Sequence, residues 1–308
     1  MTTSSSARSD EPVRLVAPAK LTLSLRVVGV RDDGYHLLDA EMASLDLGDV
    51  LELSPREDGT PSSVSLEWAD LVHGARESGS ATGTDSRYEV ANDDNLVTRA
   101  LRITGRSAHV HVVKQVPPGA GLGGGSSDAA AILRWAGISN LDEAAALGAD
   151  VPFCLTGRQA RVGGIGEVLR PVTPRPEARA LTLFILPFGM STPAVYRSWD
   201  KLSGGSGAPA GDSGEPVNHL EAAALAIEPR LGRWRDRIVE LTGLVPRLAG
   251  SGSTWFVEGT PESLGFTDRS VLAPDDAGAA RWGNESVEAG NPDGPAVVVG
   301  ATTVPGGT

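Results

Sequence analysis

The sequence predicts an α+β protein, and three patterns support this prediction. Segments that alternate apolar and polar residues, as strands do, are interleaved with helical segments but form no regular βαβ repeat. A loop with five glycines in seven residues, 119–125, joins a predicted strand to a predicted helix. The 308 residues are 40% hydrophobic and 21% charged, which is typical of a globular chain with one large or two ordinary domains.

The predicted elements begin after a polar tail. Residues 1–12 are rich in Ser and Thr, so we expect a disordered tail rather than a signal peptide. Residues 13–30 are predicted to form a strand because leucines at 21, 23 and 25 alternate with polar residues. A turn at 32–34 precedes a second predicted strand at 43–53. The polar stretch 56–87 predicts hairpins and loops.

The remaining elements follow the same rules. A helix at 92–106 is expected to be capped by Asn92 or Asp93, and a helix at 126–137 to end at Gly137. A flexible loop is expected at 203–216, and two helices broken near Pro229 at 220–241. A domain boundary is expected between 171 and 180. The other predicted strands are 109–116, 160–162, 168–172, 181–186, 247–258 (strand, turn, strand) and 296–302.

Charge and cysteine content exclude several classes of protein. The net charge is −12, and such a surface repels nucleic acid and anionic lipid, so we expect neither as a partner. The single Cys154 excludes a disulfide framework and a cysteine-clustered metal site. No apolar stretch is long enough to span a bilayer. We therefore expect a cytoplasmic protein.

The glycine-rich loop, Pro117–Ser127, predicts a phosphate-binding site. Glycine lets the backbone approach a ligand closely, and the following helix directs its unpaired N–H groups toward the loop. No Gly-Lys-Ser/Thr sequence is present, which excludes a Walker loop. Gly119, Gly121 and Gly124 match the dinucleotide pattern, but more than a hundred residues and a Pro-Pro pair precede them. The later motifs of protein kinases are absent.

Two charged residues are candidates for phosphoryl-transfer chemistry. Asp150 lies in an apolar setting just before a predicted strand, where a carboxylate could accept a hydroxyl proton; by residue type alone it is also compatible with a helix terminus or a turn. Lys20 lies on the first predicted strand, and its apolar neighbours face the other side. Only three of the 27 basic residues are lysines, so each lysine is informative. A strand lysine of this kind is either an edge residue or a functional charge.

Five stretches resemble motifs of the GHMP kinases (galactose, homoserine, mevalonate and phosphomevalonate kinases). They are Ala17–Leu21 with Gly34–His36, Asn95–Val97, Pro117–Ala131, Leu147–Phe153 and Arg247–Thr254. The motifs at 17–20 and 148–152 further resemble one member, whose substrate is a cytidine-diphosphate-linked methylerythritol. The similarity extends from about residue 13 to Thr303–Pro305.

The resemblance implies an ATP-dependent kinase that uses Mg²⁺ and phosphorylates the 2-hydroxyl of that substrate in non-mevalonate isoprenoid precursor biosynthesis. It implies a two-domain fold: 13–175 like domain 2 of ribosomal protein S5, and 176–308 ferredoxin-like. Asp150 would be the base, and Lys20 would keep it ionised and orient the hydroxyl. No acidic cluster identifies metal ligands. We expect a monomer or weak homodimer.

The resemblance also assigns binding residues. The nucleotide site would comprise Asn95, Lys114, Pro117, Pro118, Gly119, Ala120, Gly121, Leu122, Gly123, Gly124, Gly125, Ser126 and Ser127. The substrate site would comprise Tyr35, His36, Thr192, Tyr196, Gly250 and Ser251. By residue type alone, Asn95 is equally compatible with a helix cap, and Lys114 with a strand-edge charge.

Two positions depart from the family pattern. Thr22 replaces a usual Asn, which puts a substrate contact in doubt, and His219 replaces a usual Asp, which puts any metal or structural role there in doubt.

The alternative functions are a kinase of this fold with another alcohol substrate, a nucleotide sensor without catalysis, or a dinucleotide oxidoreductase. Activity that does not depend on cytidine would favour the kinase with another substrate. ATP binding without phosphoryl transfer would favour the sensor, and NAD binding would favour the oxidoreductase.

Overall fold

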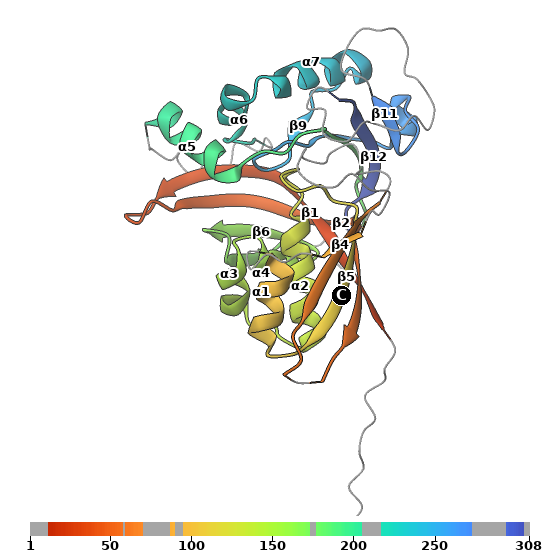
Figure 1. Cartoon of the computed structure of the whole chain (residues 1–308). Helices are drawn as coiled ribbons and strands as arrows, with labels where there is room; N and C mark the ends of the chain where they lie inside the picture. Colours follow the sequence, from red (N-terminus) through yellow and green to blue (C-terminus); the bar gives the residue numbers. More distant parts are fainter. Residues whose placement is uncertain are drawn as a thin grey trace, which may run out of the picture.

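The structure, a computed structural model, describes residues 12–57, 59–69, 87–89, 95–172, 177–204, 217–272 and 294–304. Helices α1–α4 cover one face of a long, bent sheet, and a second sheet with helices α5–α7 lies on the other side of its first two strands (Figure 1). This mixed arrangement confirms the predicted α+β class.

Strands β1 (Val13–Val30) and β2 (His36–Pro55) form a long antiparallel hairpin that reaches both halves of the molecule. The bounds of β1 agree with the predicted strand. The prediction for β2 was wrong at its start, which lies seven residues before 43. Residues 36–42 lack clear alternation, but β1 pairs with them on one side and β6 on the other, and this pairing extends the strand.

The first sheet has the order β4-β3-β5-β2-β6-β7, with β1 paired to β2. Strand β3 pairs in parallel with β5, and the other pairs are antiparallel. A six-residue strand therefore lies within the stretch expected to be loops and hairpins. The further strands are β3 (Ser63–Trp68), β4 (Arg87–Glu89), β5 (Ala108–Lys114), β6 (Gln159–Gly164) and β7 (Val168–Pro171).

Helices α1–α4 pack on this sheet, and two of them begin elsewhere than expected. Helix α1 is capped by Asn95, whose side chain accepts from the Val97 amide at 2.8 Å, rather than by Asn92 or Asp93, which lie outside the described residues. Helix α2 begins at Gly124, two residues before the predicted start. The helices are α1 (Leu96–Thr104), α2 (Gly124–Ala136), α3 (Leu141–Leu147) and α4 (Val151–Thr156).

The second sheet is antiparallel, in the order β11-β12-β8-β10-β9. The two predicted helices on either side of Pro229 are confirmed, as is the final strand. The elements are β8 (Ala180–Ile185), α5 (Thr192–Ser203), α6 (Glu221–Ile227), α7 (Arg230–Thr242), β9 (Arg247–Leu248), β10 (Trp255–Glu258), the 3₁₀ turn η2 (Glu262–Leu264), β11 (Ser270–Leu272) and β12 (Ala296–Thr302).

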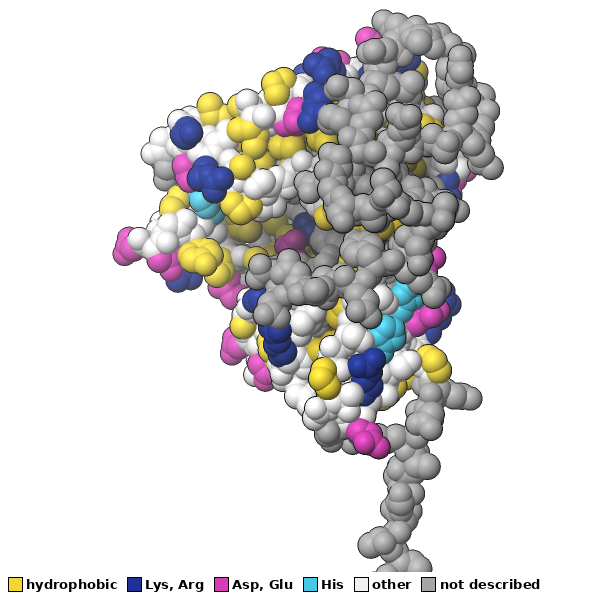
Figure 2. Space-filling model, in the orientation of Figure 1, with side chains coloured by type: hydrophobic (Ala, Val, Ile, Leu, Met, Phe, Trp, Pro, Cys, Tyr) yellow, Lys and Arg dark blue, Asp and Glu magenta, His cyan; other side chains and the backbone are white. Residues whose placement is uncertain are grey.

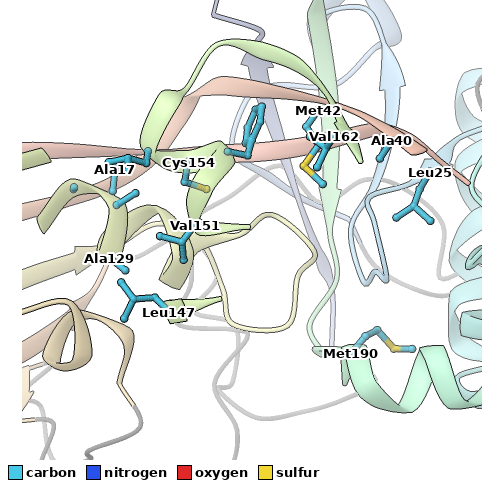
Figure 3. Packing of buried hydrophobic residues seen from close by; sticks show 14 of the residues in the cluster. Ala17, Leu25, Ala40, Met42, Ala129, Leu147, Val151, Cys154, Val162 and Met190 are labelled. Atoms are coloured by element: carbon cyan, nitrogen blue, oxygen red, sulfur yellow. The ribbon is translucent and has the colours of Figure 1, made fainter. Parts of the chain in front are cut away.

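Two hydrophobic cores share the β1–β2 hairpin because its side chains alternate between faces. Leu21 and Leu23 of β1 pack with Leu183 and Phe256 of the second sheet. The larger core contains the inward faces of the helices; Figure 3 shows Val151 and Cys154 of α4 near Ala17 of β1. The hairpin thereby fixes the position of each sheet relative to the other.

Some expectations fall on residues that the structure does not describe. The predicted tail up to residue 11, the stretch 70–86, most of the loop at 203–216 and the segment 173–176 around the expected domain boundary lie outside the described residues. None of the described helices is both long and apolar enough to cross a membrane. On the face shown in Figure 2, described acidic and basic side chains are interspersed.

Candidate active site

The glycine-rich loop lies where β1 meets the start of α2. The Lys20 amide donates to the Leu122 carbonyl at 2.9 Å, which attaches the loop to the strand. Gly123, the N-cap of α2, has a φ of 68°, in the left-handed region that favours glycine. It has no side chain to accept from the amides of the first turn of α2. Those amides and the positive end of the helix dipole suit a phosphate group.

The second half of the chain clamps this loop through its backbone. The Gly119 carbonyl accepts from the amides of Met190 at 2.9 Å and Ser253 at 3.1 Å, and the Ala120 carbonyl accepts from Thr254 at 3.1 Å. Gly121 packs so closely that a Cβ there would overlap the Ala249 carbonyl oxygen. The loop therefore owes its shape to contacts from both halves of the protein.

Lys20 and Asp150 meet beside the loop. The Lys20 Nζ lies 3.2 Å from the Asp150 Oδ2, and the Lys20 side chain is 7% exposed against 31% for Asp150. Lys20 also donates to the Thr22 hydroxyl at 3.2 Å, so the residue in the usual Asn position fixes the ammonium. A Cβ on Gly123 would lie 2.6 Å from the Lys20 Cγ, which places the lysine directly against the loop.

The local structure at Asp150 differs from the prediction. Asp150 precedes helix α4, not a strand, and occupies its N-cap position without a side-chain capping bond. The apolar run after it contains Pro152, whose fixed φ suits the first turn of a helix, and the Cys154 amide donates to the Asp150 carbonyl at 3.0 Å. Because its side chain caps nothing, the carboxylate remains directed to Lys20.

The turn between β9 and β10 approaches the same ammonium. A Cβ on Gly250 would lie 3.6 Å from the Lys20 Nζ. The Ser251 hydroxyl is 2.8 Å from that of Thr192, at the start of α5. The structure thus brings the stretch 247–254, which resembles a GHMP kinase motif, next to the Lys20–Asp150 pair.

Sequence reasoning missed the residue that holds this turn. The Asn218 side chain donates to the carbonyls of Leu248 at 2.9 Å and Gly250 at 2.7 Å. Its neighbour His219 has a structural contact, since the Val27 amide of β1 donates to its Nδ1 at 3.1 Å, and burial lowers the pKa of His219. The only sequence signal was the neighbouring position His219, where the family pattern has a usual Asp.

Lys114 lies in a buried ion cluster below the loop. Its ammonium donates to Asp128 at 2.7 Å and to Asp49, and the second oxygen of Asp49 accepts from the amides of Gln115 at 2.5 Å and Val116 at 2.9 Å. The cluster therefore ties β2, β5, the entry to the loop and the first turns of α2 together. The structure shows no strand-edge position for Lys114, which is 6% exposed.

Asp128 carries the least compensated charge in that cluster. Its Oδ1 is buried and has no hydrogen-bond partner among the described residues. Burial raises the pKa of Asp128 to about 7; Lys114 opposes this increase and the Asp49 carboxylate adds to it. Burial acts to lower the pKa of Lys114, but the charges of the Asp128 and Asp49 carboxylates outweigh burial. The net effect is a raised pKa.

This imbalance predicts a pH dependence of stability. The pKa of Asp128 is near 3.9 in the unfolded chain, so between about pH 4 and 7 the native state binds one more proton than the unfolded state. The free energy of unfolding should therefore fall as the pH rises through this window. In Asp128→Asn this contribution should be absent. Urea unfolding at pH 5, 6 and 7 measures it, with exposed Asp142→Asn as the control; parallel pH profiles for wild type and Asp128→Asn would contradict the prediction.

His36 lies in an aromatic cluster between the start of β2 and helix α5. Its ring centroid is 4.6 Å from that of Tyr196 and 5.4 Å from that of Trp199, which meets it edge-on. Its Nε2 is 2.6 Å from the Asp200 Oδ1. Burial, and then the charge of Asp150, raise the pKa of Tyr196, so this tyrosine lies within electrostatic reach of Asp150. Tyr35, at the turn before β2, is 57% exposed.

Trp199 and Asp200 were not identified from the sequence. They lie three and four residues after Tyr196, so they share its face of α5, and this spacing is the signal that would have found them.

Among the residues that the structure describes, the donor set contains no closed metal site. The described residues include no group of three His, Cys, Asp or Glu side chains that could hold a metal ion. Mg²⁺ beside a nucleotide commonly takes most of its ligands from phosphate oxygens and water. The residues present therefore fit a Mg²⁺ ion that arrives with ATP rather than one held by protein alone.

Comparisons with known proteins identify relatives of this chain. The model of the GHMP kinases N terminal domain matches residues 95–158, which include the loop and Asp150. The 4-diphosphocytidyl-2-C-methyl-D-erythritol kinase of Paracoccus denitrificans is 38% identical over 254 residues, 79% of this chain and 85% of the relative. The protein of the same name from Ruegeria pomeroyi is 34% identical and covers 84% of this chain and 92% of its own length.

Solved structures also resemble this chain. A crystal structure of 4-(cytidine 5'-diphospho)-2C-methyl-D-erythritol kinase matches with a TM-score of 0.57 and 31% identity, over 82% of this chain and 95% of that one. The mevalonate pyrophosphate decarboxylase of Streptococcus pyogenes matches with a TM-score of 0.55 at 10% identity, over 97% of this chain and 98% of its own, and this likeness concerns the fold alone.

Proposed function

The chain belongs to the 4-diphosphocytidyl-2-C-methyl-D-erythritol kinase family, within the GHMP kinase fold, and from this premise we propose how it acts. It is a small-molecule kinase that transfers the γ-phosphoryl group of ATP to the 2-hydroxyl of 4-diphosphocytidyl-2-C-methyl-D-erythritol, in isoprenoid precursor biosynthesis. The observation that carries the proposal is the Lys20–Asp150 pair at 3.2 Å beside the glycine-rich loop.

Phosphoryl transfer requires a positioned hydroxyl, neutralised phosphate charge and an acceptor for the hydroxyl proton. The backbone amides at the start of α2 bind the phosphates of ATP. Mg²⁺, when bound, supplies further positive charge on the phosphate oxygens. Because Asp150 is partly exposed at the loop, it is the group that accepts the hydroxyl proton.

The bonds change in one displacement. The substrate oxygen forms a bond to the γ-phosphorus, the bond from that phosphorus to the β,γ-bridging oxygen breaks, and ADP leaves with the electron pair. The hydroxyl proton passes to Asp150. The Lys20 ammonium, held by Thr22 and Asp150, orients the carboxylate and the attacking oxygen. The turn at Gly250 and Ser251 covers the reacting groups from the second half.

The other binding residues have corresponding roles. The cluster of His36 and Tyr196 receives the cytosine ring, with exposed Tyr35 closing over it. Asn95 and Lys114 support the nucleotide side, the first as the cap of α1 and the second through the ion cluster that shapes the loop entry. The chain divides into domains at about residue 175, in line with its two sheets. The cytoplasmic location, the monomer or weak homodimer and the absence of a nucleic-acid partner stay predictions.

An acceptor panel tests the function. Purified protein is given ATP, Mg²⁺ and the cytidylated methylerythritol, and coupled ADP release is measured beside ³¹P NMR of the product. We expect acceptor-dependent ADP release and one new phosphomonoester. Release with mevalonate, homoserine or galactose instead would identify another alcohol kinase of this fold. ATP binding without ADP release in the whole panel would indicate a nucleotide sensor.

A further inference from the structure

The hydrogen bond between His36 and Asp200 has a chemical consequence for base selection. A neutral imidazole has one N–H donor and one acceptor nitrogen, and the partner of one nitrogen decides the role of the other. The Asp200 carboxylate only accepts, so at 2.6 Å it places the proton on His36 Nε2. Nδ1 is then an acceptor, and it has no hydrogen-bond partner among the described residues.

The surroundings keep the ring in this orientation. Tyr196 lies against it at an interplanar angle of 35°, and Trp199 meets it edge-on at 85°. The His36 side chain is 12% exposed, whereas that of Asp200 is 41% exposed. Asp200 is therefore the more exposed partner of this pair, and it contacts the histidine from α5.

We infer that Asp200 is a positioning residue that fixes His36 Nδ1 as a hydrogen-bond acceptor, so that this histidine selects a pyrimidine with an amino group over one with a carbonyl group. Cytosine carries an amino donor at C4, where uracil carries a carbonyl acceptor. An amino donor satisfies Nδ1, whereas a carbonyl oxygen leaves two acceptors facing each other. This inference rests on the proposed function, since it assumes that the cluster receives the base of the substrate.

The kinetic test compares cytidine- and uridine-diphosphate-linked methylerythritol as acceptors. In Asp200→Leu the imidazole proton is free to move to Nδ1 and donate to the uracil oxygen. The ratio of kcat/KM for the two acceptors should therefore fall at least about tenfold, about 1.4 kcal/mol, with the change mainly in KM. Asp200→Asn keeps an acceptor oxygen and should retain most of the selectivity.

The control is the same pair of substitutions at Asp236, which lies on α7 with a side chain 67% exposed and bonded to Arg235. Both Asp236 variants should keep the wild-type ratio. A loss of activity toward both acceptors in equal measure, with the ratio unchanged, would mean that Asp200 only docks α5 on the hairpin and would overturn the inference.

A second measurement does not depend on turnover. The chain has five histidines, so ¹⁵N imidazole spectra can be assigned with a His36→Gln variant. We expect His36 in the Nε2–H tautomer in wild type and Asp200→Asn, and a shift toward Nδ1–H in Asp200→Leu. A doubly protonated or Nδ1–H ring in the wild type overturns the inference. If the wild type has the expected tautomer but phosphorylates neither acceptor, the proposed function fails instead.

Discussion

Asp150→Asn should lower kcat by about 10²- to 10⁴-fold, the range that a positioned general base contributes. Asparagine has nearly the same shape and still offers an oxygen to Lys20, but it cannot take the hydroxyl proton. The KM for ATP should change little, because the phosphates bind to the loop and the start of α2 rather than to Asp150. Steady-state ADP release at saturating acceptor measures kcat, and calorimetric titration measures ATP affinity.

The matched control is Asp142→Asn, at an exposed position in the first turn of α3, eight residues before Asp150. It should keep the wild-type kcat. Thermal unfolding of both variants checks the fold, since the loss of the carboxylate leaves the buried ammonium of Lys20 without its ion-pair partner. If Asp150→Asn folds, binds ATP and turns over within about threefold of wild type, another group accepts the proton.

Gly121→Ala should destabilise the protein and weaken ATP binding together. The residue has a φ of 78°, where an alanine costs about 1–2 kcal/mol. Its new Cβ would also overlap the Ala249 carbonyl and approach the Gly252 carbonyl oxygen to 2.9 Å. Since both neighbours are backbone atoms, the loop must move away from the turn between β9 and β10. We expect a total loss above about 2 kcal/mol and a KM for ATP raised at least tenfold.

Gly137→Ala separates the cost of the left-handed backbone from the cost of the steric overlap. Gly137 ends α2 with the same φ of 78°, but nothing lies within 4 Å of a Cβ there. It should show the backbone cost alone, about 1–2 kcal/mol, with an unchanged KM for ATP. Urea unfolding and ATP kinetics of both variants provide the comparison. Equal losses of stability and equal KM values in the two alanine variants would show that the loop does not depend on its clamp.

Much of the site could be predicted from the sequence because its signals are local. Five glycines between a strand and a helix predict a backbone phosphate site wherever the loop lies. The strand at 13–30 follows from alternation, and the apolar neighbours Ala19 and Leu21 place Lys20 on the opposite face of the hairpin, as observed. Lys20 and Asp150 were both identified by residue type, setting and family resemblance.

The tertiary structure decided what depends on distant partners. Asp150 precedes a helix, not a strand, because an apolar run of five residues, 151–155, fits either element and packing against α2 and α3 selects one. Asp49, Asn218 and Asp200 act on groups 65, 32 and 164 residues away, and no local pattern encodes such pairs. The sequence by itself determined which chemical groups are present and the local shape of the phosphate loop. Only the fold brought the charges together, because the free energy of a buried ion pair or hydrogen bond depends on a neighbour that chain order does not specify.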